Sequence, residues 1–323
     1  MHVLVTGASG FVGSHVAERL AADGHTLRLL LRRSSKLDFL AGLAFERADG
    51  DLRDRDALAR ATAGVDTVVH LGGLTAALTE AEYQAVNAVG TAALVWAARS
   101  AGVRRFVYVS SLAAQGPSPD GDRGQPAVPR PISSYGRSKL GGEYAVLAGQ
   151  GDMSVAVVRP PIVYGPRDHA LMPFYRLAKL GVLPLYGSGR HELSTVHARD
   201  AAAAIGQAAL AEGPNGSIYT IADGAPHTWR DLVEAFGLAL GRRPRLLSTP
   251  PFLYSVAGFG AGLAAKLARR PLPLSPEEVE SMRQPYWVCD YERIETELGW
   301  QPTLDLVAGM AQTLAWYREH KWL

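Results

Sequence analysis

The sequence predicts an α/β fold in which helices cover both faces of a doubly wound parallel sheet, with a smaller second lobe. Short apolar runs alternate with longer amphipathic segments through the first half of the chain, and a glycine-rich turn follows the first apolar run. The 323 residues are about twice the ~150 of a typical domain. Alternation of this kind indicates parallel strands that are joined by helical crossovers.

The predicted strands are continuous apolar runs, a pattern that is typical of strands buried on both faces. They cover residues 2–6, 26–31, 66–71, 105–110 and 154–159, with a weaker strand at 43–49 in the outer position of the first half. The predicted helices between them cover residues 11–22, 54–62, 80–100 and 134–148. A further helix at 200–210 and a strand at 217–223 are expected to return to the sheet.

The regular alternation ends near residue 159, after which prolines interrupt the chain. We therefore expect a large sheet domain and a smaller, discontinuous C-terminal lobe. The sheet domain would comprise residues 1–164 plus 197–225, and the lobe residues 165–196 plus 226–323.

Two segments do not fit this regular pattern. Residues 113–133 are rich in Pro, Gly and Asp and too long for an ordinary connection, which predicts either a functional lid or a mobile excursion. Residues 252–268 are the longest apolar stretch, but they are shorter than a membrane span and are interrupted by glycines and Lys266. They predict a buried or substrate-facing helix.

Composition excludes several classes of function. The 33 Lys and Arg residues balance 31 Asp and Glu residues, so the chain lacks the positive charge that nucleic-acid binding needs. The single cysteine, Cys289, excludes an intramolecular disulfide and a multi-cysteine metal site, and no other metal cluster is predicted. The N-terminus shows no secretory signal, so we expect a cytoplasmic protein.

The glycine-rich turn has the sequence TGASGFVG and carries Gly7, Gly10 and Gly13 between the first strand and the first helix. Glycines there allow a tight turn, close approach of the backbone to a pyrophosphate, and close packing of helix on strand. The helix N-terminus offers unpaired N–H groups to phosphates. The turn therefore predicts a Rossmann-type dinucleotide-binding domain, which leaves the smaller lobe to bind the substrate.

The residues after the second strand predict which dinucleotide binds. An acidic residue usually stands there to bind the adenosine ribose of NAD, but this chain has Leu31, followed by Arg32 and Arg33. Guanidinium groups form charge-assisted hydrogen bonds with phosphate oxygens. The sequence therefore favours NADP(H) over NAD(H).

A third pattern, Tyr135 with Lys139, predicts acid/base chemistry. Residues four apart share one face of a helix, so both side chains can reach the same cleft. A nearby cation would lower the pKa of the phenol toward the working pH, as proton exchange with a carbinol oxygen requires. Ser111, at the end of an upstream strand, can bind the same oxygen.

Together these motifs resemble those of the extended short-chain dehydrogenase/reductase family, also called the NAD-dependent epimerase/dehydratase family. The resemblance covers essentially the whole chain. It includes GDLRD (50–54), VVHLGG (68–73), NAVGT (87–91), YVSSLAAQG (108–116), RPPIVYGPRD (159–168) and LGWQP (298–302).

The resemblance implies roles for individual residues. Catalysis would rest on Ser111, Tyr135 and Lys139, with Lys139 also on the nicotinamide ribose. Asn87 would fix the central helix beside the active site. The implied cofactor contacts, beyond the residues already named, are Ser9, Phe11 and Val12 in the glycine turn, Asp51 and Leu52 at the adenine, Leu71, Gly72 and Gly73 along the cofactor, and Pro160 and Val163 at the nicotinamide amide. Candidate substrate contacts are Thr75, Leu112, Tyr164 and His191.

Within the family the chain departs from the enzymes of sugar nucleotides. Leu31 replaces their usual acid, and Leu193 stands where an arginine commonly holds the diphosphate, although Arg190 could substitute. The chain looks more like the branch of 3β-hydroxysteroid dehydrogenases and dihydroflavonol reductases, and the apolar helix with Tyr254, Phe259 and Trp287 would suit an apolar pocket.

The predicted function is NADP(H)-dependent interconversion of a secondary alcohol and a ketone, or reduction of an aldehyde, on an apolar molecule. Two alternatives remain. One is a sugar-nucleotide epimerase or dehydratase with tightly bound NAD(P), and the other is a non-catalytic NADP-binding protein.

The helices at 80–100 and 134–148 carry more apolar residues than contact with one sheet requires, and such helices usually have a second partner. The extra residues are Val89, Ala93, Trp96 and Ala97 on the first helix and Leu140, Tyr144 and Leu147 on the second. The resemblance implies that these helices pair with their symmetry mates, which predicts a homodimer.

Overall fold

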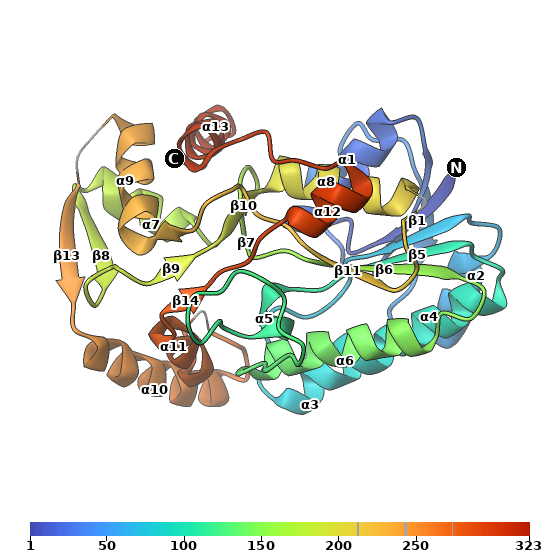
Figure 1. The fold of residues 1–323 in the computed structure, drawn as a ribbon, viewed down its shortest axis with the longest axis horizontal. Helices are drawn as coiled ribbons and strands as arrows, with labels where there is room; N and C mark the ends of the chain where they lie inside the picture. The colour runs from blue at the N-terminus through green and yellow to red at the C-terminus, as the bar shows by residue number, and fades with distance from the viewer. Residues whose placement is uncertain (212, 242–243, 273) are drawn as a thin grey trace.

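The computed structural model describes the chain except residues 212, 242–243 and 273. Its main sheet has seven parallel strands in the order β11-β6-β5-β4-β1-β2-β3 (Figure 1). The strands are β1 (His2–Thr6), β2 (Thr26–Leu31), β3 (Glu46–Asp49), β4 (Thr67–His70), β5 (Arg105–Val109), β6 (Ser154–Arg159) and β11 (Ser217–Thr220). Chain order reverses between β1 and β4, the switch point where ligands of open α/β sheets bind. The predicted doubly wound sheet is confirmed, with β3 at one edge and β11 at the other.

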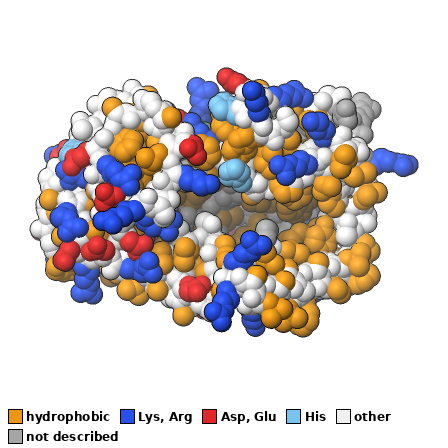
Figure 2. Space-filling view, turned by 180° about the vertical axis from the view of Figure 1, so that it is seen from behind, with side chains coloured by type: hydrophobic (Ala, Val, Ile, Leu, Met, Phe, Trp, Pro, Cys, Tyr) orange, Lys and Arg blue, Asp and Glu red, His pale blue; other side chains and the backbone are white. Residues whose placement is uncertain are grey.

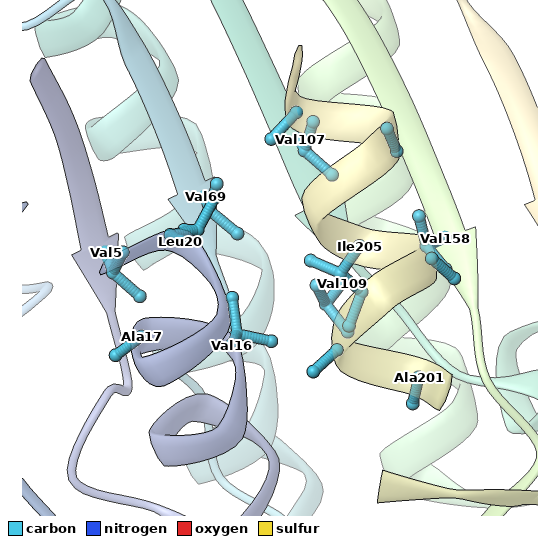
Figure 3. Packing of buried hydrophobic residues seen from close by; sticks show 14 of the residues in the cluster. Val5, Val16, Ala17, Leu20, Val69, Val107, Val109, Val158, Ala201 and Ile205 are labelled. Atoms are coloured by element: carbon cyan, nitrogen blue, oxygen red, sulfur yellow. The ribbon is translucent and has the colours of Figure 1, made fainter. Parts of the chain in front are cut away.

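Helices cover both faces of this sheet. Helices α1 (Phe11–Ala22) and α8 (Ala198–Leu210) lie on one face, and α2 (Arg55–Thr62), α4 (Thr91–Ser100) and α6 (Ser134–Ala148) lie on the other (Figure 1). Figure 3 shows the first layer: side chains of α1 and α8 meet the sheet at Val5, Val69, Val107, Val109 and Val158. Because helices bury both faces of the sheet, its strands are apolar along their whole length.

The predicted helix at 80–100 is one helical segment in three parts. It consists of α3 (Glu80–Tyr83), a π-helical stretch η2 (Gln84–Gly90) and α4. The side chain of Asn87 in η2 is buried: its Oδ1 accepts from the Leu74 N–H at 2.7 Å, and its Nδ2 donates to Ser138 Oγ at 2.9 Å. Asn87 therefore ties the loop after β4 to helix α6.

The rest of the chain forms small sheets and a separate apolar core. The small sheets pair β7 (Ile162–Tyr164) with β10 (Thr195–His197), β8 (Val182–Tyr186) with β13 (Arg245–Thr249), and β9 (Glu192–Leu193) with β12 (His227–Thr228) and β14 (Tyr286–Trp287). Helices α7 (Met172–Lys179), α9 (Trp229–Leu240) and α13 (Leu306–Glu319) share that core. The remaining helices are η1 (Asp38–Leu40), α5 (Leu112–Gln115), α10 (Pro251–Ala268), α11 (Pro276–Arg283) and α12 (Glu292–Leu298).

The long segment 113–133 is bound to the rest of the molecule at several points. Its backbone pairs with Tyr286 (Ser118 N to O, 3.0 Å) and with Asp290 (Asp290 N to Arg123 O, 3.0 Å). The Gln125 amide donates to the carbonyl of Ile218 in β11 at 2.9 Å. The segment is therefore a packed excursion that connects the main sheet to β14.

The expectation that residues 252–268 form a buried or substrate-facing helix is wrong in part. They form helix α10, but its large side chains face outward: Phe259 is 74% exposed, and Gly258 is the one buried residue of the helix. The reason is close packing through small residues, because a Cβ on Gly258 would lie 2.7 Å from Val279 of α11. In the described part of the chain, no helix combines the length and the apolarity needed to span a bilayer.

Candidate active site

The glycine turn forms a close-fitting cradle at the switch point. Gly7 has a φ of +76°, and a Cβ there would lie 2.8 Å from the backbone nitrogen of Gly72. A Cβ on Gly13 would lie 2.1 Å from the carbonyl oxygen of Gly7. Gly10 caps α1 without a side-chain hydrogen bond, so the helix N-terminus is open to an acceptor. These features fit the pyrophosphate of a dinucleotide.

The next cofactor candidates lie along the same edge of the sheet. Leu31 is buried at the end of β2, while Arg32 and Arg33 are exposed just beyond it. The Asp51 carboxylate pairs with Arg53 at 2.8 Å, and this hydrogen bond lowers the pKa of Asp51. Leu52 is buried, and its Cδ1 would lie 3.5 Å from a Cβ on Gly72.

Close packing of α5 on α6 brings Ser111 to Tyr135. A Cβ on Gly136 would lie 2.2 Å from the carbonyl oxygen of Ala113, so this contact requires glycine. The side chains of Ser111 and Tyr135 line the same pocket, Ser111 Oγ accepts from the Ala113 N–H at 3.1 Å, and the Ser111 hydroxyl favours ionisation of Tyr135. Burial nevertheless raises the pKa of Tyr135 to about 12, an effect that the Ser111 hydroxyl only partly offsets. The phenol is therefore protonated near neutral pH.

Lys139 lies on the same helix but is engaged elsewhere. Its Nζ donates to the carbonyl of Val109 at 2.7 Å and lies 4.3 Å from the centre of the Tyr108 ring. Burial lowers the pKa of Lys139 to about 7. The expectation that Lys139 lowers the pKa of Tyr135 is wrong in this structure, because the amine turns toward β5 and desolvation dominates at the phenol.

A buried ion pair that the sequence analysis did not identify lies behind these residues. Arg159 at the end of β6 pairs with Glu143 of α6 at 2.7 Å, and both side chains are almost inaccessible. Ser110 Oγ donates to the same carboxylate at 2.5 Å. The pair fixes α6 against β5 and β6. Two features of the sequence could have predicted this pair: a carboxylate one helical turn after Lys139, and an arginine at the end of a buried strand.

A pocket of about 330 Å³ opens beside Tyr135 and Ser111. Of the candidate substrate contacts, Thr75, Leu112 and His191 line it. Tyr164 does not: it is buried in the core of the C-terminal part, and its hydroxyl donates to the Asp305 carbonyl at 3.3 Å, so that prediction is wrong. The ring packs there because Gly309 of α13 leaves it room.

Of the other aromatic residues that were expected at the pocket, one lines it and two do not. Trp287 lines the pocket and donates from Nε1 to Ser281 at 2.8 Å. Tyr254 instead packs on Tyr186 with ring centres 5.1 Å apart, and Phe259 faces outward. Pocket residues that the sequence analysis missed include Tyr83 and Trp229, which only the tertiary fold brings to the site.

The charged residues of the pocket are all acidic in the described structure. Glu192, Glu277 and Glu278 line it, and no described lysine or arginine does. Glu277 accepts hydrogen bonds from the Ser134 N–H at 2.8 Å and hydroxyl at 2.6 Å, so α11 is bound to the start of α6. Burial raises the pKa of Glu278. Glu277 also forms an ion pair with Arg137 at 3.6 Å, so Glu192 and Glu278 are the pocket carboxylates that have no ion pair among the described residues.

Fold and site together define a dinucleotide-binding enzyme with a serine–tyrosine pair at the mouth of a pocket. Residues 3–222 match the model of the NAD dependent epimerase/dehydratase family, and the chain belongs to that family. It is therefore an NAD(P)-dependent oxidoreductase of the extended short-chain dehydrogenase/reductase type.

Two relatives with known activities and one solved structure illustrate the range of the family. The chain is 32% identical to ceramide reductase of Caulobacter vibrioides, over 99% of this chain and 96% of that protein. It is 31% identical to 2-alkyl-3-oxoalkanoate reductase of Stenotrophomonas maltophilia, over 98% and 99% of the two chains. The crystal structure of dTDP-glucose 4,6-dehydratase DesIV from Streptomyces venezuelae with NAD bound superposes with a TM-score of 0.80 at 28% identity, covering 100% of this chain and 98% of that one.

Proposed function

We propose that this protein is an NADP(H)-dependent reductase of ketones, or of aldehydes, on a largely apolar small molecule. The observation that carries the proposal is the pocket, which is lined by both Ser111 and Tyr135 but, among its described lining residues, by no lysine or arginine. A nucleotide diphosphate would bring negative charge against Glu192, which has no ion-pair partner among the described residues, and this is electrostatically unfavourable. The ceramide reductase relative carries a name that specifies a lipid substrate.

The chain's own residues can perform the proton chemistry. Tyr135, protonated because its pKa is raised, donates its proton to the carbonyl oxygen while Ser111 holds the same oxygen. The chemistry that a reduced nicotinamide would supply when bound is hydride donation to the carbonyl carbon. In the opposite direction Tyr135 accepts the proton of the alcohol. Asn87, through Ser138, and the Glu143–Arg159 pair keep α6 in position for this exchange.

The cofactor would lie along the carboxyl edge of the sheet. Gly7, Gly10 and the start of α1 would bind the pyrophosphate, and Arg32 with Arg33 the 2′-phosphate of NADP. Lys139 would bind the nicotinamide ribose. The remaining contacts would come from Ser9, Phe11, Val12, Asp51, Leu52, Leu71, Gly72, Gly73, Pro160 and Val163.

We further propose that two copies pair through α4 and α6. Val89, Trp96 and Tyr144 are 64%, 65% and 58% exposed, which is unusual for large apolar side chains on helices that already cover a sheet. Other residues named for this surface face inward, since Ala97 and Leu140 are buried. The division into a cofactor domain and a substrate lobe and the cytoplasmic location remain predictions.

A turnover assay tests the proposed activity. Purified protein is incubated with NADPH and, in turn, with long-chain ketones, aldehydes and nucleotide sugars. We expect NADPH to be consumed stoichiometrically with an apolar ketone or aldehyde. Conversion of a nucleotide sugar without net NADPH consumption would instead identify an epimerase or dehydratase. Tight NADPH binding without turnover of any substrate class would identify a binding protein.

A further inference from the structure

Helix α10 exposes one continuous apolar stripe. Phe252, Val256, Phe259, Leu263 and Leu267 follow one another at steps of three or four residues, so they share one face of the helix. These side chains are 64%, 67%, 74%, 56% and 80% exposed, and Leu253 beside them is 46% exposed. Figure 2 shows hydrophobic side chains gathered along the lower right edge of the molecule, where α10 lies when Figure 1 is turned around.

Contacts on the opposite face of α10 keep the apolar stripe facing away from the rest of the molecule. Gly258 and Gly262 pack on α11, where an added Cβ would lie 2.7 Å from Val279 and 3.3 Å from Pro276. Arg283 of α11 donates to Ser255 Oγ at 2.9 Å. The helix is thus held through its small residues, and rotation that would bury the phenylalanines is blocked.

The charged side chains of α10 itself and of its C-terminal end are all positive. The sequence has no Asp or Glu from residue 235 to residue 276, whereas Lys266, Arg269 and Arg270 stand at the C-terminal end of α10. Arg269 and Arg270 are exposed, and none of the three cations forms an ion pair within the described structure. An apolar helical face bordered by unpaired cations is complementary to an anionic lipid surface.

Helix α10 is also close to the substrate pocket. Helix α11 packs on α10 with Val279 and lines the pocket with Glu277, Ser281 and Met282. On the other side, Tyr254 of α10 packs on Tyr186, whose ring centre lies 5.5 Å from that of the pocket residue His191. A surface that binds α10 would therefore lie close to the wall of the substrate pocket.

We propose that α10 docks this protein on anionic lipid bilayers. The helix lies in the plane of the interface with its apolar stripe among the acyl chains and Lys266, Arg269 and Arg270 at the headgroups. This mode requires no membrane span, in keeping with the absence of a spanning helix from the described residues. The docking itself does not depend on the proposed reductase activity.

Flotation with lipid vesicles tests the proposal. The full-length protein is mixed with vesicles of equal parts phosphatidylcholine and phosphatidylglycerol, or of phosphatidylcholine alone, and the floated fraction is measured. We expect binding to the anionic vesicles and weaker binding to the neutral ones. F259E/L263E should lower the affinity for anionic vesicles at least about tenfold. R269E/R270E should remove the preference for anionic lipid.

A matched control variant introduces two glutamates outside α10. Val128 and Leu180 are 66% and 77% exposed and lie outside α10, so V128E/L180E should float like the unchanged protein. Failure of the unchanged protein to bind either vesicle, or an equal loss in the control, would overturn the proposal. A smaller particle mass for F259E/L263E without lipid would show that the stripe binds a second copy instead, which also overturns it. Because vesicle flotation needs no substrate and NADPH turnover is measured in a separate assay, failure of the docking and failure of the proposed activity remain distinguishable.

Discussion

At the scale of single residues, the site depends on a phenol that stays protonated. Burial raises the pKa of Tyr135 to about 12, and Ser111 lines the same pocket. Replacing the tyrosine by phenylalanine removes the proton but keeps the ring. We expect Tyr135→Phe to lower kcat by roughly 10² to 10⁴ and to leave the Kd for NADPH unchanged.

Tyr83 provides the matched control for this substitution. Its ring lies 6.0 Å from that of Tyr135 in the same pocket, but its hydroxyl donates to the Thr75 carbonyl at 3.3 Å. Tyr83→Phe should therefore retain most of the activity. Similar losses in both variants, measured in the NADPH assay, would refute Tyr135 as the proton donor.

Lys139 gives a pH-dependent prediction for stability. Its pKa is about 7 in the folded chain and near 10.5 when unfolded, so between these values the unfolded state binds more protons. The cost of burying Lys139 is thus largest below pH 7 and disappears as pH rises toward 10.5. Lys139→Met should be more stable than the unchanged protein at pH 7, and the difference should shrink by up to ~1.4 kcal/mol per pH unit above it.

Chemical denaturation of both proteins between pH 7 and pH 9.5 measures this difference. Other groups that titrate at high pH, such as Cys289, whose pKa burial raises to about 12, are common to both proteins and cancel. A constant difference across this range would mean that Lys139 has an ordinary pKa when folded. In turnover, Lys139→Met should lose activity, because its proposed ribose contact is removed.

The proposed preference for NADPH over NADH depends on Arg32. A charge-assisted contact with the 2′-phosphate exists only for NADPH, so Arg32→Ala should weaken NADPH binding by about tenfold to a hundredfold and NADH binding far less. Fluorescence titration measures both values. Because Arg33 could bind the same phosphate, an R32A/R33A double variant is measured as well. Equal losses of affinity for NADPH and NADH would show that these arginines do not select NADP.

At the scale of elements, the cofactor cradle depends on close contact between α1 and the turn before it. A Cβ on Gly13 would lie 2.1 Å from the Gly7 carbonyl oxygen, a distance that no relaxation of a side chain can relieve. We expect Gly13→Ala to destabilise the fold by about 1–3 kcal/mol and to weaken NADPH binding. Thermal unfolding with and without NADPH separates the two effects.

A glycine inside another helix is the control for Gly13→Ala. Gly260 in α10 has open space around its Cβ position, with no heavy atom within 4 Å. Alanine has the higher helix propensity, so Gly260→Ala should stabilise the protein by up to ~1 kcal/mol. Stabilisation by Gly13→Ala as well would contradict the close packing of α1 on the turn.

At the scale of the whole molecule, the exposed faces of α4 and α6 predict a dimer. Trp96 is 65% exposed at the centre of this surface. Light scattering at micromolar concentration should give a particle of twice 34.5 kDa, and Trp96→Glu should convert it to the single-chain mass. Leu180→Glu, which alters an equally exposed side chain elsewhere, should remain dimeric. A single-chain mass for the unchanged protein would refute the prediction.

The sheet and the catalytic helix were predictable because their signals are local. Each of the strands β1, β2, β4, β5 and β6 is a continuous apolar run, and α6 begins and ends where the sequence analysis placed it. Tyr164 and Phe259 were misplaced for a different reason. Both are large apolar residues, and the sequence pattern does not show whether such a residue faces a pocket, a core or solvent. The packing of glycines decides this, on α13 for Tyr164 and on α10 itself for Phe259.

The sequence by itself determined the parallel sheet, the glycine cradle and the placement of Tyr135 and Lys139 one turn apart on one helix, because these follow from periodicity and spacing within a few residues. The tertiary structure alone decided the charge of the pocket, the outward face of α10 and the direction of the Lys139 amine. Each of these depends on residues that are apart in the chain: Glu192 and Glu277 line the same pocket, Gly258 packs on Val279, and Lys139 binds the carbonyl of Val109. Burial, which no local pattern specifies, then sets the pKa values of Tyr135 and Lys139.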